Sequence, residues 1–204
     1  GTVWITYNGE IYNFQEIRVE LETRGHVFRT RSDTEMVVHA YEEWGDDFVT
    51  RLRGMFATAV WDKNTNRLVI VRDRMGIKPL YYTQLPDESL VFGSEIKAIL
   101  ACPEVEKRID PQALDLFLTL EYIPAPLSIF AGIRKLPAAH MLIYEQGKLT
   151  IRRYWDIENQ EAVDNDITPE EAQDRLYELL KESVRLRLIS DVPLGAFLSG
   201  GVDS

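Results

Sequence analysis

The stretch over residues 3–13 reads VWITYNGEIYN. Residues 2–7 alternate weakly and are rich in β-branched and aromatic side chains, a composition that predicts a strand. The Asn8-Gly9 pair that follows is a turn signal. Asn13 can cap a short helix, which Gly25 would end. The stretch therefore predicts mixed α and β structure from the beginning of the chain.

Downstream, short strands and helices follow one another. Ser32-Asp33-Thr34-Glu35 has the pattern of a capping box, a Ser hydroxyl with a Glu three residues on, and predicts a helix that closes at Gly45. Further helices are expected near 95–101 and after Pro111. Predicted strands lie at 26–30, 55–61, 67–72, 79–83 and 89–93, with more short strands within 121–155.

A polar and acidic segment, residues 156–167, divides the chain. We interpret it as a linker between a first domain, residues 1–155, and the beginning of a second, residues 168–204. Thr168-Pro169-Glu170-Glu171 predicts a strongly capped helix. A short apolar strand is expected over 192–198, running into a glycine-rich turn. Helix, strand and turn in that order are typical of a parallel α/β domain.

Composition excludes several classes of partner. The 204 residues carry a net charge of −10, and no basic stripe is present to track a nucleic-acid backbone. No apolar run approaches the roughly 18 residues of a membrane span. Cys102 is the single cysteine, so no internal disulfide can form, and no signal peptide is apparent. These features favour a cytoplasmic protein that binds neither nucleic acid nor membrane.

The turn after the expected last strand has the chemistry of a phosphate site. Gly200 and Gly201 lack a Cβ, so the backbone N–H groups can approach an anion closely. Ser199 and Ser204 can donate hydroxyl hydrogen bonds to phosphate oxygens, and Asp203 could hold a Mg²⁺ that bridges them. The Walker lysine is missing, so a kinase-type loop is excluded.

A second candidate site lies near the start of the chain. The Asn8 side-chain amide and the Gly9 backbone N–H are two donors that could stabilise an oxyanion. Glu10 and Asp33 are acidic groups that could hold an ammonium. Read from the residues alone, this site competes with a plain interpretation, because Asn-Gly is a common hairpin turn and an acidic residue is routine at a helix start.

Four segments together resemble the class II glutamine amidotransferase domains of the asparagine synthetase family. They occur in the family's order and read YNGEIYN at 7–13, SDTE at 32–35, RDRMGIKPLYY at 72–82 and GSEIKA at 93–98. The SGGVDS segment at 199–204 resembles the pyrophosphate loop of the N-type ATP pyrophosphatases. The resemblance extends over essentially the whole chain.

The resemblance implies a fold and roles for individual residues. It implies an α+β, αββα sandwich of the N-terminal-nucleophile type that lacks its first strands, followed by the first helix and strand of an ATP-pyrophosphatase domain. Asn8 and Gly9 match the oxyanion hole, and Asn8, Glu10 and Asp33 match glutamine-binding residues, Asp33 through the α-ammonium. Segment 72–82 is interpreted as structural. The ATP site would be Ser199, Gly200, Gly201, Asp203 and Ser204, with Mg²⁺ at Asp203.

The family's activity is the expected function. Glutamine hydrolysis would supply ammonia for the ATP-dependent amidation of aspartate to asparagine, with release of AMP and pyrophosphate. The expected ligands are glutamine, aspartate and ATP with Mg²⁺, without a prosthetic group, and the chain would pair with a second copy of itself. Two alternatives stay open: a related amidotransferase whose acceptor is a polysaccharide, a peptide or a β-lactam precursor, and an inactive fragment.

Two of the family's residues have no match. Its nucleophile is an N-terminal cysteine, and nothing here matches it or the arginine that binds the glutamine α-carboxylate. We therefore expect an internal fragment of a longer enzyme, without glutaminase activity of its own. Cys102 is interpreted as a structural thiol. The histidines lack metal-ligand spacing and are also interpreted as structural: His26, His39 and His140.

Overall fold

The computed structural model describes residues 1–158, 167–190 and 192–202. The chain forms two compact units, Gly1–Gln160 and Glu161–Ser204. The predicted linker lies mostly among residues 159–166, outside the described part of the chain. No helix in the described residues is long and apolar enough to cross a membrane.

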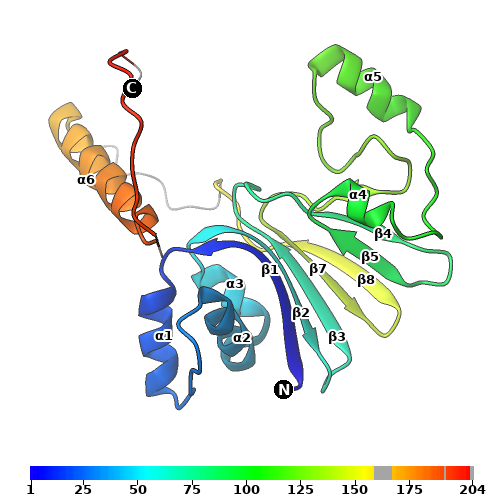
Figure 1. The fold of residues 1–204 in the computed structure, drawn as a ribbon, viewed down its shortest axis with the longest axis horizontal. Coiled ribbons are helices and arrows are strands. Elements are labelled where there is room, and N and C mark those ends of the chain that lie inside the picture. Colours follow the sequence, from blue (N-terminus) through cyan, green and yellow to red (C-terminus); the bar gives the residue numbers. More distant parts are fainter. Residues whose placement is uncertain (159–166, 191, 203–204) are drawn as a thin grey trace. The chain divides into compact units, whose positions relative to one another are not determined.

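Two antiparallel sheets form the first unit (Figure 1). The larger sheet has the strand order β1-β2-β3-β7-β8. Its strands are β1 (Val3–Ile11), β2 (Gly54–Asp62), β3 (Arg67–Arg72), β7 (His140–Glu145) and β8 (Lys148–Arg153). The smaller sheet has the order β5-β4-β6. Its strands are β4 (Tyr81–Gln84), β5 (Leu90–Gly93) and β6 (Arg134–Lys135).

Helices lie on the outer faces of the sheets. The larger sheet is covered by α1 (Phe14–Thr23), α2 (Asp33–Trp44), the 3₁₀ turn η1 (Gly45–Asp47) and α3 (Phe48–Arg51). The smaller sheet packs against α4 (Ile96–Ile99), and α5 (Pro111–Leu120) follows it along the chain. The second unit contains α6 (Pro169–Arg187).

These layers pack together through three clusters of buried apolar side chains. Alternate residues of the central strands point to opposite faces. Val60 and Val69 join the cluster beneath α1 and α2, whereas Ala59 and Ile70 join the cluster between the two sheets. A third cluster, around Ile99, joins the smaller sheet to α4. The order helix, sheet, sheet, helix confirms the expected α+β sandwich.

Several sequence predictions hold. Strands 55–61 and 67–72 form the β2–β3 hairpin. The helix expected from Ser32 is α2, with Gly45 at its C-cap. Thr168 and Glu171 form a full capping box at α6, with Pro169 in its first turn.

Several predictions of local structure are wrong, among them the side-chain cap expected from Asn13, which makes no capping hydrogen bond to α1. Asn8-Gly9 is no turn, because both residues pair with β2 inside β1. Residues 26–30 form no strand, since the Arg29 and Thr30 N–H groups donate to the Glu35 carboxylate at 2.8 and 2.6 Å. Because the Glu35 carboxylate binds those two N–H groups, it does not complete the expected capping box. The Ser32 hydroxyl still caps α2 by accepting a hydrogen bond from the Thr34 N–H.

The strand expected at 192–198 is also absent from the described residues. A strand needs a neighbour to accept its backbone hydrogen bonds. In the described part of the second unit the regular structure is α6 alone, and Phe197 and Leu198 are fully or largely exposed. An apolar sequence with no sheet to join stays extended without pairing.

Candidate functional site

The site predicted near the start of the chain lies at the edge of the larger sheet. β1 is its outermost strand among the described residues. Asn8 and Glu10 alternate with Gly9 and therefore share one face of β1. Asn8 lies opposite Ala57, which belongs to the cluster between the two sheets. The Asn8 amide thus projects toward the gap between the sheets.

A hollow of about 130 Å³ opens at this place. Its wall includes Asn8, Ala57, Leu80, Phe92 and Ser94. The Asn8 Nδ2 donates to the Ser94 Oγ at 2.9 Å, which fixes the direction of the amide. The sequence analysis quoted Ser94 within the GSEIKA segment but gave it no role; the structure brings that segment to YNGEIYN.

The Gly9 N–H points out of the sheet. Gly9 lies opposite Phe56, whose carbonyl accepts from the Asp73 N–H at 2.8 Å and whose N–H donates to the Asp73 carboxylate at 3.2 Å. Both polar groups of Phe56 therefore face away from β1. In such a pair of an antiparallel ladder the opposite residue also points outward. The Gly9 N–H is accordingly presented at the open edge.

Gly9 is also the residue that the close approach of β2 requires. A Cβ at this position would lie 2.2 Å from the Met55 carbonyl oxygen and 2.6 Å from the Phe56 Cα. Those atoms belong to the β2 backbone, so they cannot move away by a change of side-chain rotamer. The glycine serves the fold as well as the site.

Gly9→Ala is expected to lower the free energy of unfolding by about 1–3 kcal/mol, the usual cost of overpacking, because β1 must separate from β2. Gly93→Ala is the matched control: it adds a Cβ in another strand, where the nearest atoms lie at an ordinary 3.6 Å. Urea denaturation of both variants measures the difference. Equal stability of the two variants would contradict the close approach.

Asp33 closes the same edge from the helix side. Its Oδ2 accepts from the Tyr7 hydroxyl at 2.7 Å and from the Ile11 N–H at 3.0 Å. Its Oδ1 has only 3.5 Å contacts with the hydroxyls of Ser32 and Thr34, which leaves that oxygen able to accept a strong hydrogen bond. Asp33 thus anchors the start of α2 to β1 and keeps a carboxylate oxygen available for a ligand.

Gly9 and Ile11 are alternate residues, so their N–H groups point in the same direction from β1. Two residues of strand span about 7 Å. The Gly9 donor and the Asp33 carboxylate, which is bound at Ile11, therefore stand about 7 Å apart along one edge. An N–H group and a carboxylate at this spacing can hold the two polar ends of an amino-acid-sized ligand.

Tyr7 was missed by the sequence analysis. Its hydroxyl donates a hydrogen bond to the Asp33 carboxylate. Burial, as the larger cause, and this hydrogen bond raise the pKa of the Tyr7 phenol well above 10.0. The folded state thus prefers neutral Tyr7. The stability this gives is complete below pH 10.0, the ordinary pKa, and is lost as pH rises above it.

In alkaline solution the free energy of unfolding is expected to fall with pH, and the Tyr7 contribution to that slope rises through about pH 10 toward about 1.4 kcal/mol per pH unit. Burial also raises the pKa of Tyr154. Tyr7→Phe should therefore remove only the Tyr7 contribution to the pH dependence of the free energy of unfolding. Urea titrations between pH 9 and 11 measure the slope, with Tyr122→Phe as the control at an exposed tyrosine. An unchanged slope in Tyr7→Phe would refute the assignment.

The loop after β3 holds β2 behind the site. The buried Asp73 carboxylate accepts the backbone N–H groups of Phe56, Met75, Ile77 and Lys78 at 2.9–3.2 Å. From the other side, Arg72 donates to the carbonyls of Gly76, Lys78 and Leu136 at 2.7–2.8 Å. Burial lowers the pKa of Arg72. These bonds support the structural interpretation of segment 72–82.

Cys102 lies far from this edge in the layered order of the unit. It packs with the cluster around Ile99, and its S–H donates to the Glu104 carboxylate at 3.1 Å. That hydrogen bond raises the pKa of the thiol, which disfavours the reactive thiolate. A structural thiol is the interpretation that these contacts support.

The phosphate site predicted in the second unit is described only in part. Gly200 and Gly201 form a bend directly after Ser199, and the Gly201 N–H donates to the Ser199 Oγ at 3.3 Å. Gly200 has a φ of 80°, a backbone conformation that favours glycine. Asp203 and Ser204 lie outside the described residues.

Known proteins are similar in sequence to this chain over its whole length. It is 43% identical over 204 residues to asparagine synthetase [glutamine-hydrolyzing] 3 of Bacillus subtilis, with 100% of this chain and 33% of that protein covered. It is 38% identical over 205 residues to the same organism's asparagine synthetase [glutamine-hydrolyzing] 1, with 100% and 32% covered. The chain thus spans about a third of the length of these relatives.

The fold is similar to that of solved glutamine amidotransferases. One is the glutamine phosphoribosylpyrophosphate amidotransferase from B. subtilis, with a TM-score of 0.51 and 20% identity over 74% of this chain and 29% of that one. By sequence, residues 175–204 match the asparagine synthase family, and residues 1–155 match the glutamine amidotransferase domain family. The sandwich, the open β1 edge and this match over three quarters of the chain place the protein in the glutamine amidotransferase domain family.

Proposed function

We propose that this chain is part of a glutamine-hydrolysing asparagine synthetase. The observation that carries the proposal is the β1 edge, where the Asn8 amide, the Gly9 N–H and the Asp33 carboxylate are arranged along one strand. In this proposal residues 1–155 form the glutaminase domain, residues 156–167 the linker and residues 168–204 the beginning of the ATP-cleaving domain. The cytoplasm is the compartment that fits a chain with a single cysteine.

Glutamine would lie along the edge of β1. Its α-ammonium would meet Asp33, with Glu10 on the neighbouring face, and its amide carbonyl would lie near Gly9 and Asn8. Attack on that carbonyl turns its oxygen into an oxyanion. In this proposal the Asn8 amide and the Gly9 N–H would both donate to that oxygen and stabilise its charge, which typically accelerates acyl transfer strongly. Ser94 would hold the Asn8 amide in the direction that this role requires.

In the second domain ATP would activate the β-carboxylate of aspartate, and ammonia would displace AMP. Ser199, Gly200 and Gly201 would contact phosphates through hydroxyl and N–H groups. Asp203 is the single carboxylate between residues 192 and 204 and would be the Mg²⁺ ligand. Leu176, Leu179 and Leu180 on α6 are more than half exposed, an apolar stripe suited to packing within a larger domain.

The test is the product analysis of a full-length protein that carries this chain. Incubation with ATP, aspartate and glutamine should yield AMP, pyrophosphate and asparagine in equal amounts. If AMP forms only with another acceptor, such as a peptide or a polysaccharide, the related amidotransferase is the correct assignment. If no AMP forms with any acceptor, the synthetase proposal fails.

The 204-residue chain by itself is expected to release no glutamate from glutamine. Its single thiol is held in a different layer from the β1 edge and has a raised pKa, so no thiol in the described residues is placed to attack at that edge. Glutamate release is measured against Asn8→Ala as a background control. Release above that background would show a nucleophile that the structure does not assign.

A further inference from the structure

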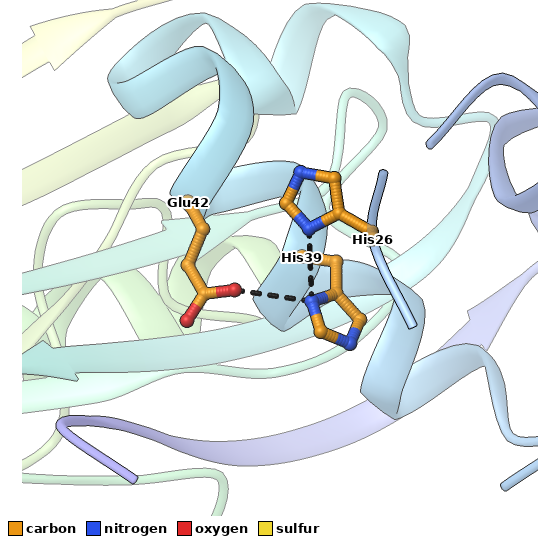
Figure 2. Close-up of side chains that lie close together, drawn as sticks. All are labelled: His26, His39 and Glu42. Atoms are coloured by element: carbon orange, nitrogen blue, oxygen red, sulfur yellow. Dashed lines mark hydrogen bonds and ion pairs between the residues drawn. The ribbon is translucent and has the colours of Figure 1, made fainter. Parts of the chain in front are cut away.

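The side chains of two histidines and a glutamate lie close together beside α2 (Figure 2). His26 lies in the segment between α1 and α2, whereas His39 and Glu42 lie one turn apart on α2. The sequence analysis found no metal-ligand spacing here, because the histidines are 13 residues apart and meet only when α1 and α2 pack together. The chemistry of the proposed enzyme uses none of the three.

The distances suit a small divalent cation. The His26 and His39 Nδ1 atoms are 3.1 Å apart, and the Glu42 Oε2 lies 3.0 Å from the His39 Nδ1. All three ligand atoms lie within 4.8 Å of one another. A tetrahedral Zn²⁺ with bonds of about 2.0–2.1 Å separates its ligand atoms by about 3.3 Å. Two imidazoles and one carboxylate are ligands that Zn²⁺ accepts.

A carboxylate lies on the far side of each ring. The Glu43 Oε2 lies 3.1 Å from the His26 Nε2, a hydrogen-bond distance, whereas the Glu35 Oε1 lies 3.9 Å from the His39 Nε2. At His26 the carboxylate favours the proton on Nε2 and leaves the Nδ1 lone pair facing inward. Metal-binding histidines in proteins usually have such a partner.

This arrangement brings together three electron-rich atoms. The His26 Nδ1 faces the His39 Nδ1 at 3.1 Å, and the His39 Nδ1 also faces the acceptor-only Glu42 carboxylate at 3.0 Å, so one cation between these atoms would satisfy all three together. A proton on His39 would satisfy one contact at a time, because its N–H cannot point at the His26 Nδ1 and at Glu42 together. Arg24 does not supply the charge, since its guanidinium donates to Glu43 and Glu20 instead.

We propose that His26, His39 and Glu42 bind one Zn²⁺ with its fourth position open to water. The side chains of His26 and His39 are 16% and 18% exposed, and that of Glu42 is 39% exposed, so an ion can enter from solvent. The metal joins the segment before α2 to α2 itself, six residues from Asp33. It thereby fixes the segment that leads into α2 against the second half of that helix. The proposal does not depend on the function of the β1 edge.

The experiment uses the 204-residue chain freed of metal by a chelator. Titration with Co²⁺ should give one equivalent per chain and the visible absorption bands of a tetrahedral site, which Zn²⁺ then displaces. Zn²⁺ should raise the melting temperature. His26→Gln with His39→Gln should abolish both effects. Glu43→Gln, which removes a carboxylate that does not touch the ion, should weaken binding about 10–100-fold.

Controls separate this site from general metal binding. His140→Gln alters the third histidine, whose Nδ1 lies 2.7 Å from the Ala138 carbonyl, and Cys102→Ser removes the thiol. Both variants should bind Co²⁺ like the unaltered chain. Circular dichroism without metal verifies that each variant folds. Absence of binding at micromolar Co²⁺, or equal binding by the folded double histidine variant, would overturn the proposal.

Discussion

Asn8→Ala in a full-length protein that carries this chain is expected to lower kcat for glutamine hydrolysis by about 10²–10³-fold. The substitution removes the side-chain donor that Ser94 aims into the hollow between the sheets, while β1 keeps its backbone pairing. The Gly9 N–H remains, so some activity survives. Steady-state glutamate release measures the effect, and the loss should appear in kcat more than in KM because the bond strengthens as the oxyanion forms.

Synthesis from free ammonia provides the internal control. It does not need the oxyanion site, so Asn8→Ala should leave ammonia-dependent formation of asparagine within about twofold of the unaltered protein. Asn64→Ala changes an exposed asparagine in the β2–β3 turn and should affect neither reaction. An equal loss of both activities in Asn8→Ala would indicate damage to the fold, and full glutaminase activity would exclude Asn8 from the oxyanion site.

Asp73→Asn is expected to destabilise the first unit by about 3 kcal/mol or more, the largest stability effect we expect. Each carboxylate oxygen of Asp73 accepts two backbone N–H groups in a fully buried setting. An asparagine keeps the shape but turns one oxygen into an NH₂ group, which then faces two N–H donors. Those donors are left unsatisfied at a cost of about 1–3 kcal/mol each.

Urea denaturation followed by tryptophan fluorescence measures this loss in the 204-residue chain. Asp115→Asn is the matched control, because Asp115 lies exposed on α5 and should change stability by less than about 0.5 kcal/mol. Since Asp73 also fixes Phe56 opposite Gly9, Asp73→Asn should loosen the β1 edge. Equal midpoints for the two variants would show that the four hydrogen bonds contribute little net stability.

Local patterns predicted the elements whose hydrogen bonds are satisfied nearby. The β2–β3 hairpin and the ends of α2 and α6 depend on residues close in sequence, so turn and capping signals identified them. Asn8-Gly9 failed as a turn because pairing with residues 56 and 57, far along the chain, overrode the local preference. Residues 26–30 failed because Glu35 competes for the N–H groups that a strand would need.

The sequence predicted the residues of the candidate site that would contact a ligand, but not the residues that hold them in place. Asn8, Gly9 and Asp33 stand in motifs that resemble a known family. Tyr7 contacts Asp33, 26 residues away in sequence, and Ser94 contacts Asn8, 86 residues away. Local sequence patterns do not predict contacts at such separations. The zinc ligands were missed for the same reason, since packing of a loop on a helix creates them.

The pairing of β3 with β7 has a consequence for synthesis on the ribosome. Val69 lies beside Ile143, and the whole smaller sheet is encoded between these two strands. Strands β1, β2 and β3 are therefore synthesised before their inner partner, β7. Until then β3 presents an unpaired edge, a template for association with other chains. Such a layout slows folding and favours chaperone contact during translation of residues 73–139.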